Sequence, residues 1–445
     1  MNKATIIQSA QGTGDRLTVK GEFSAAQKRE GILALTLNKA KRYQQVVGFG
    51  GAFTESAAYT YSRLDKAVQE EIIRLYFDPA RGIGYGIGRV HIHSCDFSLE
   101  NYTYVKENDR ELSTFDLSRE DRWTVPFIRD AIAARGQDIP LLASPWSPPA
   151  WMKTNGEMNN GGKLLPEYAG VWARYFVEYI REMQKRGFHI WAVTVQNETE
   201  ALQTWDSCLY TAGEEADFVK RHLGPTLRDS GLSDVRIYII DHNRDILFER
   251  AKATLSDPEA AQYIYGVANH WYVSEDFSAL SKVHEMFPDK HILFTEGCIE
   301  GGVKPGSWQT GERYGRNILG DFNNWQEGWI DWNLILDEQG GPNHKANYCD
   351  APIIANTKTQ QLTVNSSYYY IGQFSRFVKP GAVRIEVETE VATTLTHAAF
   401  ENTDGSIALV VMNETDDAQE LQAGAGANFV AHTLPAHAIA TFVFA

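Results

Sequence analysis

Residues 166–198 read PEYAGVWARYFVEYIREMQKRGFHIWAVTVQNE, and they contain one helix pattern followed by one strand pattern. Apolar side chains recur at helical spacing through Pro166–Arg186, which predicts an amphipathic helix. The short apolar run Trp191–Gln196 then predicts a buried strand. Two polar residues, Asn197 and Glu198, follow this strand directly. The stretch therefore predicts one α/β unit with polar side chains at the end of its strand.

The same alternation of short apolar runs and longer helical patterns recurs along the middle of the chain. The strand candidates are Val46–Phe53, Gly86–His93, Pro140–Pro145, Trp191–Gln196, Arg236–Asp241, Tyr263–His270, His291–Thr295 and Gly328–Leu334. Repeated strand–helix units predict a parallel sheet, and eight of them are what a TIM barrel requires. We therefore expect an α/β protein with a (β/α)8 barrel over residues 43–380.

Both ends of the chain have a different pattern. Ile32–Leu37, Ile407–Met412 and His432–Phe444 are strand-like segments separated by turn residues, with no helical pattern between them. Such segments are typical of antiparallel β-structure. We expect residues 1–42 and 381–445 to form one side β-sandwich domain, built from both termini, beside the catalytic barrel.

The composition narrows the class of partner. The 445 residues include 11 Trp, 20 Tyr and 21 Phe, and the formal net charge is −15. An acidic surface repels phosphate backbones and anionic lipids, so nucleic acid is excluded as a partner. A neutral ligand that stacks on aromatic rings fits better, and a carbohydrate or glycoside is the expected class.

The chain turns polar directly after Met1–Ile7, so no signal-peptide core is predicted. No apolar run approaches the ~20 residues that span a bilayer. Cys95, Cys208, Cys298 and Cys349 are widely spaced and form no C-x-x-C pair, which is typical of free thiols in a reducing compartment. We therefore expect a cytoplasmic protein without stable membrane association.

Two glutamates stand at predicted strand ends. Glu198 follows the fourth strand candidate and Glu296 follows the seventh. In a TIM barrel the reactive residues lie at the C-terminal ends of the strands. Glycoside hydrolysis needs one carboxylic acid to protonate the leaving oxygen and one carboxylate on the opposite face of the sugar. The other strand ends add aromatic, amide and acidic groups, among them Asp96, Trp146, Asn197, His270, Tyr272 and Trp332.

Several motifs accompany these strand ends: GFGGAFT (48–54), GR (88–89), SCDFS (94–98), ASPWSPP (143–149), QNE (196–198), FTEGC (294–298), DWN (331–333), GGPN (340–343) and PII (352–354). In combination they resemble glycoside hydrolase family 30 over roughly residues 44–380. The likeness is to its glucosylceramidase and β-1,6-glucanase branch rather than its xylanase branch. The resemblance implies a retaining β-glycosidase on a (β/α)8 barrel with a side β-domain and no cofactor.

Carried over by position, the resemblance implies that Glu296 is the nucleophile and Glu198 the general acid/base. Asn197 would bond the sugar 2-hydroxyl, while Arg89 and Tyr272 would orient the nucleophile and keep it ionised. The two carboxyls should lie about 5–5.5 Å apart, as retention requires. The acid also needs a raised pKa, which burial and the neighbouring carboxylate would supply.

The resemblance further implies a shell of residues around the glucose in subsite −1. Asp96 and Trp146 match positions that hold its outer hydroxyls, and Trp332 matches a position that stacks on the sugar ring. His270 and Asn347 belong to the same shell. We expect no metal in this site.

The expected substrates are β-linked glucosides, either small β-glucosides or β-1,6-gluco-oligosaccharides. A family member specific for another β-sugar, such as xylose or fucose, or for glucosylceramide is the alternative. One residue departs from the family pattern, since Thr199 stands where a proline usually follows the acid/base. The loss of proline relaxes the φ restriction of the loop, so this loop and its leaving-group contacts stay open.

A different chemistry is the main rival. His91 and His93 fall on one face of a strand, as metal ligands would. With His242, His270 and Asp331 they form a set similar to that of metal-dependent amidohydrolase barrels. Against this hypothesis, the fourth strand ends in a glutamate rather than a lysine. A carbohydrate-binding protein without catalysis is a third hypothesis, but binding alone needs no paired acid and nucleophile.

Overall fold

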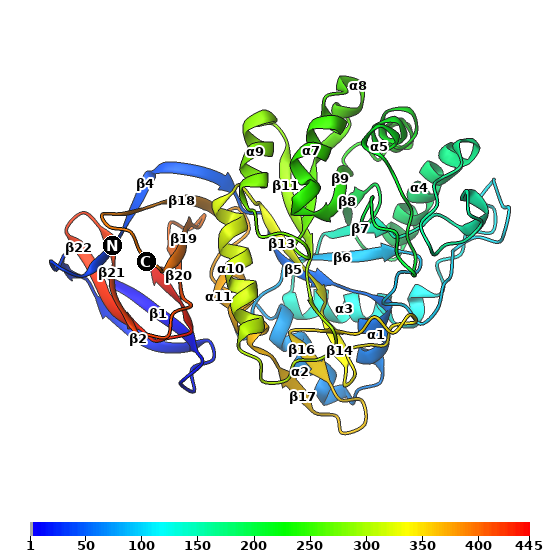
Figure 1. The fold of residues 1–445 in the computed structure, drawn as a ribbon. Helices are drawn as coiled ribbons and strands as arrows, with labels where there is room; N and C mark the ends of the chain where they lie inside the picture. The colour runs from blue at the N-terminus through cyan, green and yellow to red at the C-terminus, as the bar shows by residue number, and fades with distance from the viewer. Residues whose placement is uncertain (1–2) are drawn as a thin grey trace.

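The computed structural model describes residues 3–445 and consists of a closed eight-stranded barrel with a ten-stranded β-sheet domain beside it (Figure 1). Met1 and Asn2, which belong to the predicted segment 1–42, lie outside the described residues. Within residues 3–445, no helix has the length and apolar character needed to cross a membrane. The predicted α/β barrel and the side β-domain are both confirmed.

Each barrel strand lies on one of the eight predicted apolar runs and pairs in parallel with its neighbours. Around the barrel the strands are β10 (Ile264–His270), β11 (His291–Glu296), β13 (Gly328–Asn333), β5 (Gly48–Ala52), β6 (Ile87–Ile92), β7 (Leu141–Pro145), β8 (Ile190–Thr194) and β9 (Arg236–Asn243). Parallel strands that are covered on both faces have nearly continuous apolar sequences. The barrel strands could therefore be predicted from short apolar runs in the sequence.

Helices connect the strands and surround the barrel (Figure 1). They are α1 (Glu55–Ser62), α2 (Lys66–Phe77), α3 (Thr124–Arg135), α4 (Ala169–Lys185), α5 (Ala212–Phe218), α6 (Gly224–Asp229), α7 (Arg244–Leu255), α8 (Pro258–Ala261), α9 (Ser278–Met286), α10 (Gln309–Asn323) and α11 (Ser366–Ser375). Helix α4 carries the predicted apolar face, on which Trp172, Tyr175 and Tyr179 are buried. Each buried aromatic ring removes about 150–250 Å² from water, so this face strongly stabilises the barrel.

The side domain is one sheet built from both ends of the chain. Its strands, in order, are β2 (Thr18–Ser24), β1 (Lys3–Ala10), β23 (Ala438–Phe444), β20 (Ile407–Asn413), β19 (Thr396–Glu401), β18 (Val383–Thr389), β4 (Leu33–Gln45), β21 (Gln419–Ala425), β22 (Asn428–Leu434) and β3 (Ala26–Gln27). The sheet has a hydrophobic core of its own, separate from that of the barrel. Strand β4 ends at Gln45, immediately before the first barrel strand.

Two small sheets lie in the long loops after β11 and β13. One pairs β12 (Ile299–Glu300) with β15 (Cys349–Asp350), and the other orders β14 (Ile335–Asp337), β16 (Ile353–Ala355) and β17 (Leu362–Val364). The first of these sheets connects the loop that follows Glu296 to the loop that carries Asn347. It therefore helps to position two predicted site residues.

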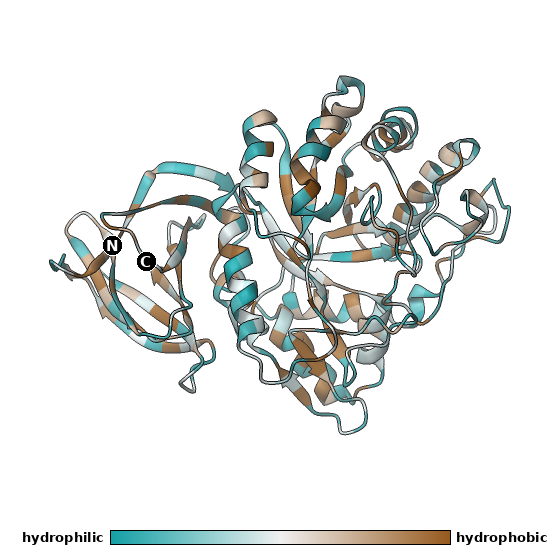
Figure 2. Cartoon of the chain, viewed as in Figure 1, coloured by the Kyte–Doolittle hydropathy of each residue, from teal (hydrophilic) through white to brown (hydrophobic). Residues whose placement is uncertain are grey.

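The distribution of polar side chains shows which end of the barrel carries chemistry. Buried hydrophobic residues from the barrel strands and from the surrounding helices form one large core, and Figure 2 shows hydrophobic segments on both kinds of element. Ile87, Leu142, Leu293 and Ile330 form one apolar cluster inside the barrel. Buried polar residues instead gather toward the C-terminal ends of the strands, where Arg89, Ser144, Thr194, Asp241, His270, Thr295 and Glu296 stand.

Candidate active site

A cavity of about 280 Å³ opens at the C-terminal end of the barrel strands. Eight predicted site residues line it: Asp96, Trp146, Asn197, Glu198, Tyr272, Glu296, Trp332 and Asn347. The other two, Arg89 and His270, are fully buried beside the cavity and approach its two glutamates. The structure therefore brings all of the predicted site residues together.

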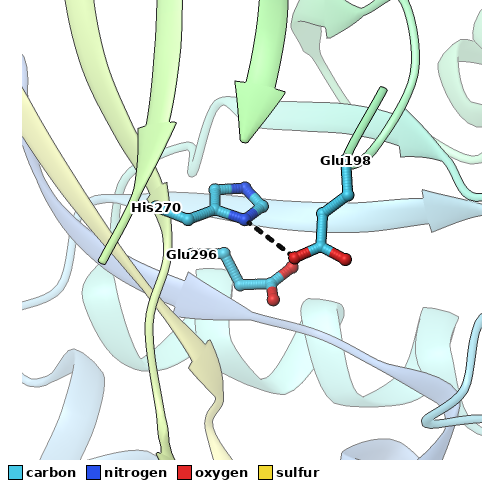
Figure 3. Close-up of side chains that lie close together, drawn as sticks. All are labelled: Glu198, His270 and Glu296. Carbon is cyan, nitrogen blue, oxygen red and sulfur yellow. Dashed lines mark ion pairs between the residues drawn. The ribbon is translucent and has the colours of Figure 1, made fainter. Parts of the chain in front are cut away.

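Glu198 and Glu296 approach each other within this cavity (Figure 3). Glu198 stands in the loop after β8, and Glu296 is the last residue of β11. One carboxylate oxygen of each, together with a ring nitrogen of His270, lie within 4.8 Å of one another. Retaining glycosidases hold their carboxyls about 5–5.5 Å apart, and inverting ones about 6.5–9.5 Å. The observed spacing favours the retaining class.

Glu296 is held at both oxygens. Arg89 donates from Nη1 to Oε2 at 2.7 Å, and the Tyr272 hydroxyl donates to Oε1 at 2.8 Å. Burial raises the pKa of Glu296 above its usual range, and the charge of Glu198 acts in the same direction. Arg89, His270 and Tyr272 act against this shift. The side chain is therefore fixed in place, and its charge depends on the cations around it.

Glu198 has looser contacts. Its Oε1 lies 3.7 Å from Nδ1 of His270, and Gln203 donates to its Oε2 at 3.5 Å. Burial tends to raise the pKa of Glu198, but its contacts with His270, His242 and Gln203 together outweigh burial, and the pKa lies below the usual value. The expected raised pKa is therefore wrong for this structure, because a histidine cation beside Glu198 favours its ionised form.

The buried carboxylate of Asp241 binds both Arg89 and His270 beside the cavity. Asp241, at the end of β9, accepts hydrogen bonds from Arg89 Nη2 at 2.8 Å, Thr194 Oγ1 at 2.7 Å, Thr295 Oγ1 at 2.6 Å and His270 Nε2 at 2.9 Å. Burial opposes its ionisation, yet Arg89 and His270 hold the pKa of Asp241 well below its usual range. Asp241 was not among the predicted site residues, although its place near a strand end was a signal.

Arg89 connects this buried carboxylate to the cavity. Beyond Asp241 and Glu296, its guanidinium donates to Asn197 Oδ1 at 2.9 Å and to Ser144 Oγ at 3.1 Å. Because the amide oxygen of Asn197 is occupied, its NH2 group remains as the donor toward a ligand. The fully buried guanidinium of Arg89 therefore orients both Glu296 and Asn197.

Another part of the cavity wall is aromatic and polar. The rings of Trp146 and Trp332 stack with centroids 5.2 Å apart. Asp96 accepts hydrogen bonds from Asn343 Nδ2 and Asn347 Nδ2, each at 3.2 Å. Burial, followed by the charge of Glu296, raises the pKa of Asp96 to about 8. Both causes favour the protonated form of Asp96.

Backbone geometry near the glutamates is unusual. The φ angles are +51° at Glu198, +75° at Ile240 and +48° at Asp241. Such conformations cost of order 1–3 kcal/mol each and cluster at functional sites. The Glu198 N–H donates to the Asp241 carbonyl at 2.8 Å, and the Thr199 hydroxyl donates to the Ile240 carbonyl at 3.3 Å. Thr199 thus makes a contact that the usual proline has no hydroxyl to form.

Two histidines of the metal-barrel rival, His91 and His93, are occupied by contacts away from the cavity. His91 Nε2 accepts the Glu55 N–H at 2.9 Å. His93 bonds the Tyr175 hydroxyl at 2.9 Å, and its other ring nitrogen bonds a backbone carbonyl. Burial lowers the pKa of His93 to about 3. Both rings are therefore part of the packed wall, away from His270.

Several other residues line the cavity without having been predicted as site residues. They are Phe97, Gln203, Trp205, Asn243, Val273, Cys298, Glu300 and Cys349. Gln203 and Trp205 belong to the loop that begins at Glu198, and Val273 directly follows Tyr272. Proximity to a strand end was the available signal, because the loops after barrel strands form the mouth.

Two family models match the chain. The model described as the glycosyl hydrolase family 30 TIM-barrel domain matches residues 46–378, and the model described as the glycosyl hydrolase family 30 beta sandwich domain matches residues 381–442. Lysosomal acid glucosylceramidase of Mus musculus is 38% identical over 417 residues, which are 89% of this chain and 80% of the mouse protein.

Solved structures have the same two-domain fold. SrfJ from Salmonella typhimurium shares 35% sequence identity and has a TM-score of 0.95, with 99% of each chain covered. An endo-β-1,6-glucanase structure shares 31% identity and has a TM-score of 0.90, with 100% of this chain and 99% of that chain covered. The likeness therefore extends over the barrel and the side domain together.

Proposed function

This chain belongs to glycosyl hydrolase family 30, and from that membership we propose that it is a retaining β-glycosidase that hydrolyses β-linked glucosides by double displacement. The observation that carries the proposal is the pair formed by Glu198 and Glu296, whose carboxylate oxygens come within 4.8 Å of each other. This spacing suits direct attack by one carboxylate on the sugar rather than attack through an intervening water.

In the first step Glu296 attacks the anomeric carbon and forms a glycosyl–enzyme bond. Arg89 and Tyr272 bind its two oxygens and aim it at the sugar. Glu198 simultaneously donates a proton to the leaving oxygen, because an alkoxide is a poor leaving group without one. Barrel residues alone supply these groups, so we assign catalysis to residues 43–380 and no catalytic residue to the side domain.

Other cavity residues bind the glucose ring in this proposal. The NH2 group of Asn197 donates to the 2-hydroxyl, a contact that strengthens in the transition state of glycoside hydrolysis. Asp96 and Trp146 bind the outer hydroxyls, with Asn347 fixing the Asp96 carboxyl. Trp332 packs on the apolar face of the sugar.

In the second step Glu198 acts as a base. It takes a proton from a water molecule, which attacks the anomeric carbon and breaks the bond to Glu296. Two inversions at the same carbon restore the β configuration. The same residue serves as acid and then base because microscopic reversibility requires it.

Small β-glucosides and β-1,6-gluco-oligosaccharides are the proposed substrates. The cavity of about 280 Å³ that contains both glutamates is the proposed site of the sugar ring. Gln203 and Trp205 stand beside Glu198 in this cavity, where the leaving group departs. The endo-β-1,6-glucanase with the same fold supports this choice of linkage.

Glucosylceramide is a second candidate. The mouse relative is a glucosylceramidase, and Val273 lines the cavity with 65% of its surface exposed. An exposed aliphatic side chain at the mouth suits an apolar aglycone. Hydrolysis of glucosylceramide presented in detergent micelles, at a rate above that of gentiobiose, would favour this candidate.

The test is a panel of aryl β-glycosides, followed by gentiobiose and longer β-1,6-oligomers, with the first-formed anomer observed by proton NMR. Cleavage of β-glucosides with β-glucose released first is the expected result. Cleavage of β-xyloside or β-fucoside without turnover of β-glucoside would overturn the sugar assignment. Release of α-glucose first would overturn the retaining mechanism.

A further inference from the structure

His270 bridges a buried anion and the proposed acid/base. Its Nε2 lies 2.9 Å from Asp241 Oδ1, and its Nδ1 lies 3.7 Å from Glu198 Oε1 (Figure 3). The ring is fully buried, and within residues 3–445 its Nδ1 has no hydrogen-bond partner. One nitrogen is thus fixed, while the other faces the carboxyl group that must gain and lose a proton.

Asp241 determines the tautomer of this ring. Its carboxylate already accepts bonds from Arg89, Thr194 and Thr295, and it is ionised. An ionised carboxylate only accepts hydrogen bonds, so His270 must donate from Nε2. Any proton that the ring gains or loses is therefore carried on Nδ1, on the side of Glu198.

The charges around His270 favour its protonated form. Asp241 and His242 face it from β9, Glu198 from the loop after β8 and Glu296 from β11. The Tyr272 ring, which lies just after the end of β10, packs edge-on against it. Burial alone lowers the pKa of His270, but the charges of Glu296, Asp241 and Glu198 together raise it to about 9.

Glu198 has few other titratable neighbours. His242 faces it from β9 and Glu296 from β11. The charge of Glu198 also raises the pKa of Asp96, in the loop after β6, and of Glu300, on β12. Burial lowers the pKa of His242, so its ring is neutral above about pH 7. His270 is therefore the cation that faces Glu198 from neutral pH up to about pH 9.

We propose that His270, fixed by Asp241, is a positioning residue that stores the proton which Glu198 delivers to the leaving group. This inference rests on the proposed function of Glu198. The proton moves from Nδ1 of the imidazolium to Oε1 of Glu198, which leaves a neutral ring still bonded through Nε2–H to Asp241. Glu198 then passes the proton to the glycosidic oxygen. When Glu198 later takes a proton from water, that proton returns to Nδ1.

The exchange of one proton between His270 and Glu198 determines the alkaline side of the pH profile. A charged His270 with an ionised Glu198, and a neutral His270 with a protonated Glu198, contain the same number of protons and interconvert without exchange with solvent. The pair therefore loses its last proton in one macroscopic step. In the wild type this step falls near the pKa of His270, about 9. The alkaline limb of kcat/KM, which reports the free enzyme, should lie there.

The test is His270→Gln, which keeps a donor toward Asp241 but holds no exchangeable charge. Glu198 must then retain its own proton, and the alkaline limb should move down by about two pH units or more. His242→Gln is the matched control, because that ring is already neutral in this range, and its alkaline limb should stay in place. An alkaline limb that is unmoved or moves upward in His270→Gln would overturn the proposal.

A second measurement does not depend on activity. In protein labelled with 15N-histidine, one ring should titrate near pH 9, and Glu198→Gln should lower that midpoint because an anion is lost. A His270 signal that titrates at or below the ordinary value, about 6.5, would overturn the proposal. This result holds even if His270→Gln does not fold, because it is measured on the wild-type protein. Wild-type protein without β-glycosidase activity would instead refute the proposed function, while this titration would still test His270.

Discussion

The hydroxyl of Tyr272 lies 2.8 Å from Oε1 of Glu296, and Tyr272 reaches it from the neighbouring strand end of the barrel. The same hydroxyl lies 3.6 Å from the Cys298 thiol. Arg89 approaches the other oxygen of Glu296 from β6. The orientation of the proposed nucleophile is therefore set by strands on both sides of the barrel mouth.

Tyr272→Phe removes one of these two donors without opening a cavity. A hydrogen bond to a charged group contributes about 1.5–3 kcal/mol, so kcat/KM should fall roughly 10- to 100-fold. Steady-state kinetics with an aryl β-glucoside measure the effect. Tyr314→Phe is the matched control, since that hydroxyl bonds Asp331 rather than either glutamate. Equal losses in the two variants would contradict a specific role for Tyr272.

Glu198→Ala removes the acid/base but leaves the nucleophile in place. Glycosyl–enzyme should still form from an aryl glucoside with an acidic leaving group, because such a group departs without protonation. Azide, which needs no general base, should then accelerate turnover and give a β-glucosyl azide. In Glu296→Ala the attack comes directly from azide and should give the α-azide. An α-azide from Glu198→Ala would contradict the assignment of the two residues.

Asp331 should make stability depend on pH. Burial raises its pKa to about 8, while an unfolded chain titrates this group near about 3.9. Between these values the folded chain holds a proton that the unfolded chain has released, so the free energy of unfolding falls as pH rises. Asp331→Asn has no such group, and its urea-unfolding free energy should fall less between pH 4 and 8. A parallel pH dependence in both proteins would contradict the raised pKa.

The buried ion pair between Arg244 and Asp321 should be far more important for stability than an exposed pair. Arg244 donates two bonds to Asp321, at 2.8 and 2.5 Å, and neither side chain is exposed. Removing one partner leaves a buried charge uncompensated, which costs about 3–5 kcal/mol. Asp321→Ala should show this loss in urea unfolding. Asp229→Ala, which breaks the exposed pair with Arg228, should change stability by under about 1 kcal/mol.

The sequence was sufficient to predict the barrel and the two glutamates. Each buried parallel strand is a local apolar run, and reactive residues of a barrel follow such runs. Glu198 and Glu296 could be placed for that reason, although they are far apart in the chain. Thr199 was also visible as a departure, but only the structure shows its bond to Ile240.

The buried network beneath the cavity could not be predicted in the same way. Asp241 is contacted by Arg89 from β6, Thr194 from β8 and Thr295 from β11, so its surroundings depend on strand register and on the closure of the barrel. Neither is encoded in a local pattern. The pKa of Glu198 was predicted in the wrong direction because the proximity of His270 depends on that same closure.

Strand β1 pairs with β23 from Ala4 opposite Phe444 to Ala10 opposite Ala438. Domains generally fold during synthesis as their residues emerge, at about 5–20 residues per second, so β1 waits roughly 20–90 seconds for its partner. During this time β2 pairs with one edge of β1. The other edge of β1 stays unpaired and can pair with a strand of another chain. A chain that ends after the barrel lacks β23, so this edge of β1 would stay unpaired. We expect such a chain to aggregate during or soon after synthesis rather than accumulate as a shorter enzyme.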